Sequence, residues 1–208
     1  MGVSGRRRTA GPLLALLLIG AARATAQEER QQWSGSVAAF LTVVDDLAFV
    51  LPVAAVDRGP LHLEARYNYE DLGAFSGWVG WNVDLEGALA VRLTPMVGGI
   101  VGSFTALAPG FELTLEWRSL SFYSETELAL PLDDGDPFLF TWSSVRWQPH
   151  KLVVLGASGQ SLEAAGTERL IDLGPMIGLS IGPVGAEVYW FNPGTSDAFM
   201  FFGATFSF

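Results

Sequence analysis

Apolar and polar side chains alternate along most of the chain with a period of two. In residues 61–70 the odd positions are apolar or aromatic, and the even positions are His, Glu, Arg, Asn and Glu. Residues 79–86, 111–118 and 119–130 follow the same rule. Because successive side chains of a β-strand point to opposite faces, this pattern predicts an all-β, antiparallel chain whose strands each have one apolar and one polar face.

Strands of this kind occur in two classes of structure. In a soluble sandwich the apolar faces meet in a dry core, whereas in a transmembrane β-barrel they contact lipid and the polar faces line the lumen. Alternation alone does not separate the two classes. An export signal, the position of the aromatic residues and the C-terminal motif favour the barrel.

Residues 1–26 have the three parts of a secretory signal peptide. Residues 6–8 are arginines, residues 13–19 are apolar, and Ala24-Thr25-Ala26 matches a small-x-small cleavage site. An N-terminal membrane anchor is the alternative, but the apolar run is shorter than the roughly 20 residues that span a bilayer. We therefore expect signal peptidase to cleave after Ala26, so that residues 27–208 form the exported barrel.

Composition narrows the classes of function. The 208 residues are 50% hydrophobic and 16% charged, which excludes a disordered chain. A formal net charge of −10 argues against a nucleic-acid partner, which requires a basic surface. The chain has no cysteine, which excludes a disulfide framework and a thiolate metal site.

Aromatic residues gather near the ends of the apolar faces, as interfacial girdles do in membrane barrels.

The chain ends with Gly203, Phe206 and Phe208 in the order Gly-x-x-aromatic-x-aromatic. This ending resembles the C-terminal signal of bacterial outer-membrane proteins, except that Phe201 stands where a polar residue is usual. The resemblance implies recognition by the barrel-assembly machinery and a location in the bacterial outer membrane, surrounded by its lipid. An ordinary hydrophobic C-terminal strand is the alternative.

Turn residues divide the chain into twelve expected strands, with ten as the alternative if 88–105 or 111–130 is misread. The twelve are 34–44, 60–71, 75–85, 88–95, 97–105, 111–118, 120–130, 137–147, 151–160, 168–181, 184–192 and 198–208. An even number places both chain ends on the periplasmic side. The outer connections are then 45–59, 86–87, 106–110, 131–136, 161–167 and 193–197, and the periplasmic ones are 72–74, 96, 119, 148–150 and 182–183.

The longest of these connections, 45–59, is apolar and contains Pro52, which disfavours a central strand. We expect an extended hairpin above the membrane. A plug that folds into the barrel mouth is the alternative.

Charged residues on the polar faces must point into the barrel, because a charge at the bilayer midplane costs roughly 2–4 kcal/mol. This predicts a lumen lined by Glu64, Arg66, Glu70, Asp84, Glu112, Glu116, Arg118, Glu125, Glu127, Arg146 and Glu187. Two roles are open: an ion-pair network that plugs a narrow barrel, or a permeation path whose negative potential favours cations. The bulky side chains Trp78, Tyr123 and Tyr189 would narrow the lumen in either case.

The sequence offers few candidates for chemistry. His62 and His150 are the only histidines. His62 with nearby Asp57 is a conceivable acid–base pair at the outer rim, but a place in the charged lining is the simpler interpretation. His150 is expected to be solvated in a turn. We find no metal-ligand spacing, serine-hydrolase elbow or phosphate loop, and we therefore expect neither an enzyme nor a cofactor.

The chain resembles small bacterial outer-membrane β-barrel proteins, and its size and strand number are similar to those of the twelve-stranded, monomeric oligosaccharide-specific porins. Those porins line their channels with basic residues for acidic sugars, so the acidic lumen argues against carrying over that substrate class. We favour a narrow, weakly cation-preferring channel or passive transporter. A closed barrel for adhesion, assembly or envelope stability is the alternative, and a lipid or peptide hydrolase is a third hypothesis. The solute and the oligomeric state stay open.

Overall fold

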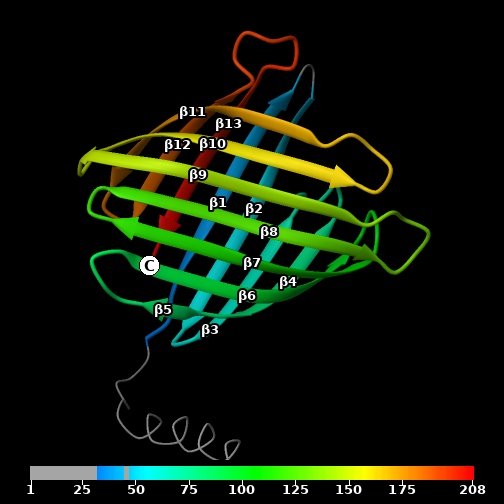
Figure 1. Ribbon diagram of the computed structural model, residues 1–208, viewed down its shortest axis with the longest axis horizontal. Coiled ribbons are helices and arrows are strands. Elements are labelled where there is room, and N and C mark those ends of the chain that lie inside the picture. Colours follow the sequence, from blue (N-terminus) through cyan, green and yellow to red (C-terminus); the bar gives the residue numbers. More distant parts are fainter. Residues whose placement is uncertain (1–31, 45–46) are drawn as a thin grey trace, which may run out of the picture. The chain divides into compact units, whose positions relative to one another are not determined.

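The computed structural model describes residues 32–44 and 47–208, and the predicted signal peptide of residues 1–26 lies outside them. The described residues form strands joined by turns and loops (Figure 1). This part of the chain has no helix that is long and apolar enough to cross a membrane. The strands are β1 (Ser34–Val44), β2 (Leu47–Arg58), β3 (Leu61–Tyr67), β4 (Phe75–Trp81), β5 (Val83–Leu85), β6 (Ala90–Val101), β7 (Ala106–Trp117), β8 (Leu120–Pro131), β9 (Phe138–His150), β10 (Val153–Ala164), β11 (Leu170–Ile181), β12 (Val184–Phe191) and β13 (Phe199–Ser207).

The strands close into an antiparallel barrel. β1 pairs with β13 from Ser36–Ser207 to Val43–Met200, which joins the two ends of the sheet. β4 and β5 both pair with β6 and are therefore two halves of one crossing. The described chain thus forms a closed barrel of twelve strands, which confirms the prediction of twelve over the alternative of ten.

A proline explains why the crossing made by β4 and β5 is interrupted. The β4–β6 pairing ends at Met96 and the β5–β6 pairing begins at Leu93, so the ladder skips Pro95. Proline has no N–H to donate to a neighbouring strand. β6 continues through Pro95 because it stays paired with β7 on its other side. The predicted turn at 96 is therefore wrong, and the predicted strands 88–95 and 97–105 are a single strand.

The outer connection predicted at 45–59 is also wrong, because residues 47–58 form β2. Pro52 is tolerated there because pairing with β3 begins only at Val53, so Pro52 has one partner strand, β1. The missed strand β2 and the division of β6 into two predicted strands cancel, so the predicted number of strands is still twelve. The two errors invert the direction of the strands between residues 60 and 95, however, which changes where the residues of this region lie.

The two ends of the barrel differ in their connections. We call the end where β1 begins and β13 ends the periplasmic end, as in single-chain outer-membrane barrels. The turns 59–60, 118–119, 151–152 and 182–183 at this end are short, whereas the connections 68–74 and 192–198 at the outer end are longer. Four other predicted connections need correction. Residues 72–74 lie at the outer end and 86–87 at the periplasmic end, whereas 106–110 lie within β7 and 148–150 within β9.

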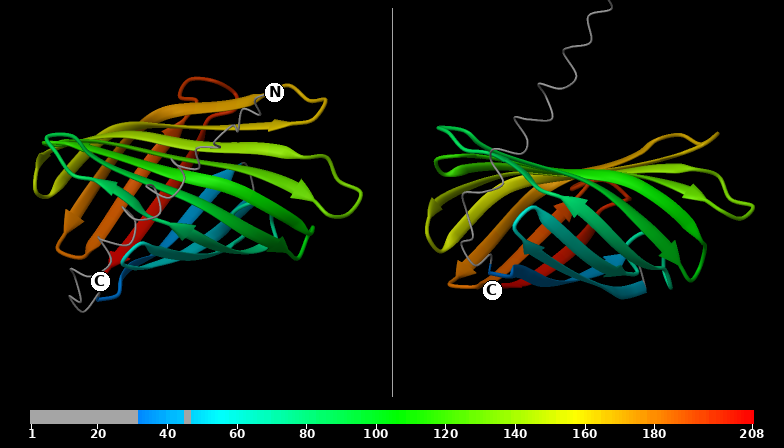
Figure 2. Two further views of the ribbon diagram at one scale, coloured as in Figure 1. Left: turned by 60° about the horizontal axis from the view of Figure 1, so that its bottom comes forward. Right: turned by 90° about the horizontal axis from the view of Figure 1, so that it is seen from below.

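The strands are tilted, as closure of a barrel requires. In Figure 1 the strands β6 to β11 of the front wall cross the strands β1 to β3 of the rear wall, and Figure 2 shows the same crossing from two further sides. Strands far apart in the sequence therefore face each other across the lumen.

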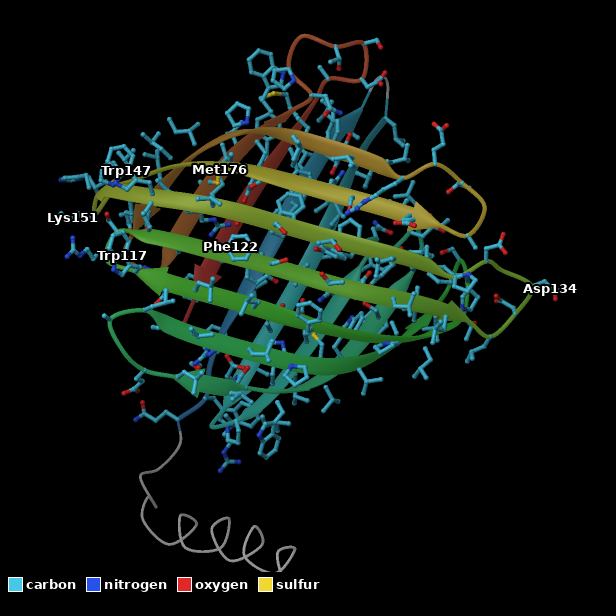
Figure 3. The ribbon with its side chains drawn as sticks, viewed as in Figure 1. Trp117, Phe122, Asp134, Trp147, Lys151 and Met176 are labelled. Atoms are coloured by element: carbon cyan, nitrogen blue, oxygen red, sulfur yellow. The ribbon has the colours of Figure 1, made fainter. Side chains whose placement is uncertain are left out.

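The outer surface of the barrel is apolar. Val79, Leu93 and Ile177 are among the many large hydrophobic side chains that point outward and are exposed. Trp117 and Trp147 lie beside the Lys151 turn at the periplasmic end, and Asp134 lies on a loop at the outer end (Figure 3). An apolar band with tryptophans near its edge is the surface of a barrel in lipid, so the structure confirms the transmembrane barrel over the soluble sandwich.

The interior is largely filled by side chains in two clusters. The first cluster lies on β4, β6, β7 and β8 and at the end of the 68–74 connection, and it consists of Ala74, Trp78, Met96, Ile100, Ala106, Ala108 and Ala129. The second cluster is aromatic, lies mainly on β9, β12 and β13, and consists of Leu51, Trp142, Met176, Tyr189, Phe191 and Phe201. The lumen is therefore much narrower than the backbone cylinder suggests.

We predict that Gly98→Ala destabilises the barrel and that Gly99→Ala does not. A Cβ on Gly98 would stand 2.4 Å from the ring of the buried Trp78, whereas a Cβ on Gly99 meets nothing within 4 Å. Overpacking of this kind costs about 1–3 kcal/mol. Denaturant unfolding of the barrel in phospholipid vesicles, followed by tryptophan fluorescence, measures both variants. Equal free energies of unfolding would show that the Trp78 ring can move aside.

Candidate functional site

The inner face of β3 carries the charged core of the lumen. His62, Glu64 and Arg66 alternate with apolar residues along this strand, and all three are buried. The period of two places them on one face. Since that face points into the lumen, they meet residues from the opposite wall.

Arg66 joins the two walls. Its Nε donates to Glu64 Oε1 at 2.8 Å, and its Nη1 donates to Glu125 Oε1 and, at 3.0 Å, to Glu127 Oε2 on β8. Nη1 also lies 3.9 Å from Glu70 Oε1 in the connection after β3. Arg66 is only 1% exposed, so these charge-assisted hydrogen bonds are formed away from water.

Aromatic side chains enclose this guanidinium. Arg66 Cζ lies 4.6 Å from the ring centroid of Tyr69 and 4.8 Å from that of Trp78, both within the range of cation–π attraction. The hydroxyls of Tyr69 and Tyr123 each lie 3.2 Å from Glu125 Oε2. Arg66 is therefore held by planar groups as well as by carboxylates.

The cluster contains more acidic than basic groups. Among the described residues, Arg66 is the only lysine or arginine within 4.0 Å of Glu64, Glu70, Glu125 and Glu127. Within the same part of the chain, Glu70 Oε2 and Glu127 Oε1 are buried without a hydrogen-bond partner. One guanidinium neutralises one negative charge. The rest must be balanced by protons or by cations from solution.

A second ion pair lies on the wall formed by β9 and β12. Arg146 Nη2 is 3.1 Å from Glu187 Oε2, and the Tyr189 hydroxyl donates to the same carboxylate. Tyr189 belongs to the aromatic cluster and packs edge-to-face on Trp142, with ring centroids 5.4 Å apart. This pair is half-buried, so it is more accessible to water than Arg66.

His62 lies at the periplasmic end of the lumen. The prediction that it stands at the outer rim is wrong, because β3 starts at the opposite end from the one expected. The pairing of His62 with Asp57 that the sequence suggested is present, since His62 Nδ1 donates to Asp57 Oδ1 at 2.9 Å. His62 Nε2 is 3.4 Å from Glu64 Oε2. Carboxylates, and not a hydroxyl nucleophile, therefore face both ring nitrogens.

A cavity of about 830 Å³ occupies the outer part of the lumen and reaches the level of the Arg66 cluster. Residues 68–72 and 196–198 of two outer connections contribute to its rim. It extends down to Ala38, which lies in the periplasmic half of β1, and to Glu64, which lies at the middle of β3. Its side walls are largely aromatic and include Phe40, Phe140, Trp142 and Phe201.

The predicted lumen residues fall into four groups. Glu64, Arg66, Glu70, Glu112, Glu125 and Glu127 lie together in or beside the Arg66 cluster, and Arg146 pairs with Glu187 on the other wall. Asp84 and Glu116 are exposed near the periplasmic end, where Asp84 pairs with Arg92 at 2.7 Å. Arg118 does not line the lumen. It occupies a turn with a positive φ of 56° and stacks on Trp117 at 5.0 Å.

The C-terminal motif forms part of the closing strand. Gly203 lies against the Phe40 ring, which a Cβ at this position would approach within 3.0 Å. Phe206 and Phe208 are exposed and stack with ring centroids 6.4 Å apart. Phe208 exchanges backbone hydrogen bonds of 2.9 and 3.0 Å with Gly35 of β1. Recognition of this motif by the assembly machinery stays a prediction.

The sequence analysis placed Tyr189 of the interior aromatic wall in the lumen but missed the aromatic residues that β9 contributes to it. Trp142 and Phe140 point inward beside Ser144 and Arg146. The signal was available, because all four occupy even positions of β9 and Arg146 had to face the lumen. Tyr69 was also missed as a partner of Arg66, since it lies beyond the end of β3.

Comparison with known proteins supports the fold. A scan against protein-family models and a search of curated proteins found no match. The NanC porin matches with a TM-score of 0.57 and 9% identity, over 84% of this chain and 98% of NanC. The KdgM porin, in a complex with disordered oligogalacturonate, matches with a TM-score of 0.60 and 10% identity, over 83% of this chain and 99% of KdgM. At this level of identity the likeness shows the fold, which is that of an outer-membrane porin barrel.

We predict that Arg66→Met destabilises the barrel far more than Arg92→Met. Removal of Arg66 leaves buried carboxylates facing each other without a cation, which costs about 3–5 kcal/mol. Arg92 and Asp84 are each half exposed, and pairs of this kind contribute about 0–1 kcal/mol. Denaturant midpoints in vesicles give the comparison. Similar midpoints for the two variants would mean that Arg66 does not hold the two walls together.

Proposed function

We propose that this protein is an outer-membrane channel for small solutes and that it prefers cations. The observation that carries the proposal is the cavity of about 830 Å³, which is bordered by outer connections and continues down to Ala38 and Glu64. A barrel that served only as a structural element would have no need of such an entrance.

The proposed route past the Arg66 cluster follows the wall on which the inward side chains are small. Near the periplasmic end, the inward positions of β1, β2, β12 and β13 hold small, partly accessible residues: Ser36, Ala55, Gly185 and Thr205. The charged cluster belongs to β3 and β8. Ala55 is the cross-strand partner of Glu64 in that cluster, and the other three small residues lie farther around the barrel on β1, β12 and β13. Small side chains beside a rigid cluster leave room for water and small solutes while excluding large ones.

The charge of the cavity supports the cation preference. Of the residues that line it, one is basic, Arg146, and seven are acidic: Glu64, Glu70, Asp71, Glu125, Glu127, Asp172 and Asp197. A cleft with low-dielectric walls focuses the field of such groups and concentrates ions of opposite sign. The same field repels polyanions, so oligogalacturonate, named for the KdgM complex, is a poor solute for this lumen.

The mature chain in planar lipid bilayers should give discrete conductance steps, and under a KCl gradient the reversal potential should show a K⁺ preference. Asp71→Asn with Asp197→Asn should weaken that preference. A carboxylate about 8 Å from a permeating ion in water contributes about 0.5 kcal/mol, or roughly a twofold change in permeability ratio.

Asp134→Asn with Asp136→Asn is the matched control, because it removes the same charge from an outer loop that does not line the cavity. It should leave the permeability ratio unchanged. The absence of conductance steps from correctly folded barrels would overturn the channel and leave a closed barrel. An anion preference, or equal effects of the two double variants, would overturn the proposed origin of selectivity.

A further inference from the structure

A cluster of three metal-ligating side chains lies in the lumen below the Arg66 cluster. His62, Glu64 and Glu112 each offer one ligand atom, and these atoms lie within 4.8 Å of one another. His62 and Glu64 are buried on β3, and Glu112 reaches them from β7. The period of two along β3 places the first two side by side, and barrel closure adds the third.

Asp57 orients the imidazole for binding. His62 Nδ1 donates to Asp57 Oδ1 at 2.9 Å, and Asn82 Nδ2 donates to the same oxygen at 2.8 Å. The Asn82 amide oxygen in turn accepts from the Thr94 hydroxyl at 2.6 Å. A histidine that gives its second N–H to a carboxylate in this way is typical of metal ligands, because the hydrogen bond fixes the tautomer and raises ligand basicity.

With Nδ1 donating to Asp57, Nε2 is left facing acceptors. It lies 3.4 Å from Glu64 Oε2, which also accepts from Arg66 Nη2 at 3.3 Å. The other oxygen of Glu64 is bound by Arg66 Nε at 2.8 Å. A ring-nitrogen lone pair and a carboxylate oxygen repel each other unless a positive charge stands between them. That charge is either a proton on Nε2 or a cation that both groups coordinate.

A second observation also indicates a missing cation. In the adjoining Arg66 cluster, the described structure provides no hydrogen-bond partner for Glu70 Oε2 or Glu127 Oε1, although the side chains of both residues are at most 1% exposed. Both residues line the same cavity as Glu64. Buried carboxylate oxygens are normally paired or coordinate a metal. Glu64 belongs both to this cluster and to the group around His62, so the excess of carboxylates adjoins the metal-ligating side chains.

We infer that His62 Nε2, Glu64 and Glu112 bind one divalent transition-metal ion of the Zn²⁺ class. One imidazole and two carboxylates suit zinc and its first-row neighbours, whereas Ca²⁺ and Mg²⁺ prefer ligand sets made of oxygen alone. Bonds of about 2 Å in tetrahedral geometry separate ligand atoms by roughly 3.3 Å, so Glu112 moves inward on binding. The fourth position is filled by water from the lumen. The site does not depend on whether the barrel conducts.

Isothermal titration calorimetry of the mature barrel in detergent, prepared without a polyhistidine tag, tests the site with ZnCl₂ as the probe. We expect one Zn²⁺ per chain. His62→Ala and Glu112→Gln remove ligands and should each weaken binding about tenfold or more, and Asp57→Asn should weaken it by about tenfold through loss of the orienting bond. His150→Ala is the matched control, because it removes the other histidine of the chain from an exposed position, and it should bind as the unaltered chain does.

The alternative is an imidazolium ion held between Asp57 and Glu64 without a metal. It predicts no saturable Zn²⁺ binding at concentrations up to about 1 mM. A dissociation constant of about 1 mM corresponds to a binding free energy of about −4 kcal/mol. The absence of binding in this range would overturn the proposal. Binding that survives His62→Ala, or that is lost in His150→Ala, would overturn it as well. Electrophoretic mobility before and after heating shows which variants are folded. If His62→Ala does not fold, Glu112→Gln decides, since it keeps the shape of the side chain.

Discussion

Lipid offers no hydrogen-bond partners to a polypeptide backbone, so each strand that crosses the bilayer must be paired on both sides. This requirement explains the pairing of β1 with β13, which extends to reciprocal bonds between Gly35 and Phe208 at the very end of the chain. It also explains why β4 and β5 stay aligned on β6 although Pro95 interrupts the ladder between them. Once the cylinder is closed, each side chain faces either lipid or the lumen, and every charged residue at membrane depth must share the small interior space.

Closure thereby brings together charges that the sequence keeps far apart. Arg66 and Glu125 are 59 positions apart, and they meet because β3 and β8 stand on opposite walls of a narrow barrel. Their contact both closes part of the lumen and determines the shape of what remains open. Glu64 is held between Arg66 on one side and His62 on the other, so the structural cluster and the proposed metal site share a carboxylate. A substitution in the Arg66 cluster is therefore expected to affect the proposed metal site, and the reverse.

Local alternation predicted the barrel, the strands from 111 onward and the inward direction of Glu125, Glu127 and Arg146, because a period of two is a property of each strand alone. It did not predict β2 or the unbroken β6. Both contain a proline, and whether a strand tolerates proline depends on which partner lies beside it. That is a property of the assembled sheet: Pro52 has one partner strand, and Pro95 faces the break between β4 and β5. The meeting of His62 with Glu112 was equally hidden, since no spacing within one strand encodes a contact across a lumen.

The excess of carboxylates in the lumen relates the two proposals without making either depend on the other. A single guanidinium shared among Glu64, Glu125 and Glu127 leaves negative charge that must be balanced from outside the chain. At the outer entrance Asp71 and Asp197 are exposed to water, where mobile ions can balance their charge, as the proposed channel requires. Beside His62 two carboxylates are largely shielded from water and place oxygens within 4.8 Å of one ring nitrogen, so that a fixed ion is the more effective partner there under the second proposal. Under the two proposals, the same charge deficit attracts transient cations at the outer entrance and one bound cation beside His62.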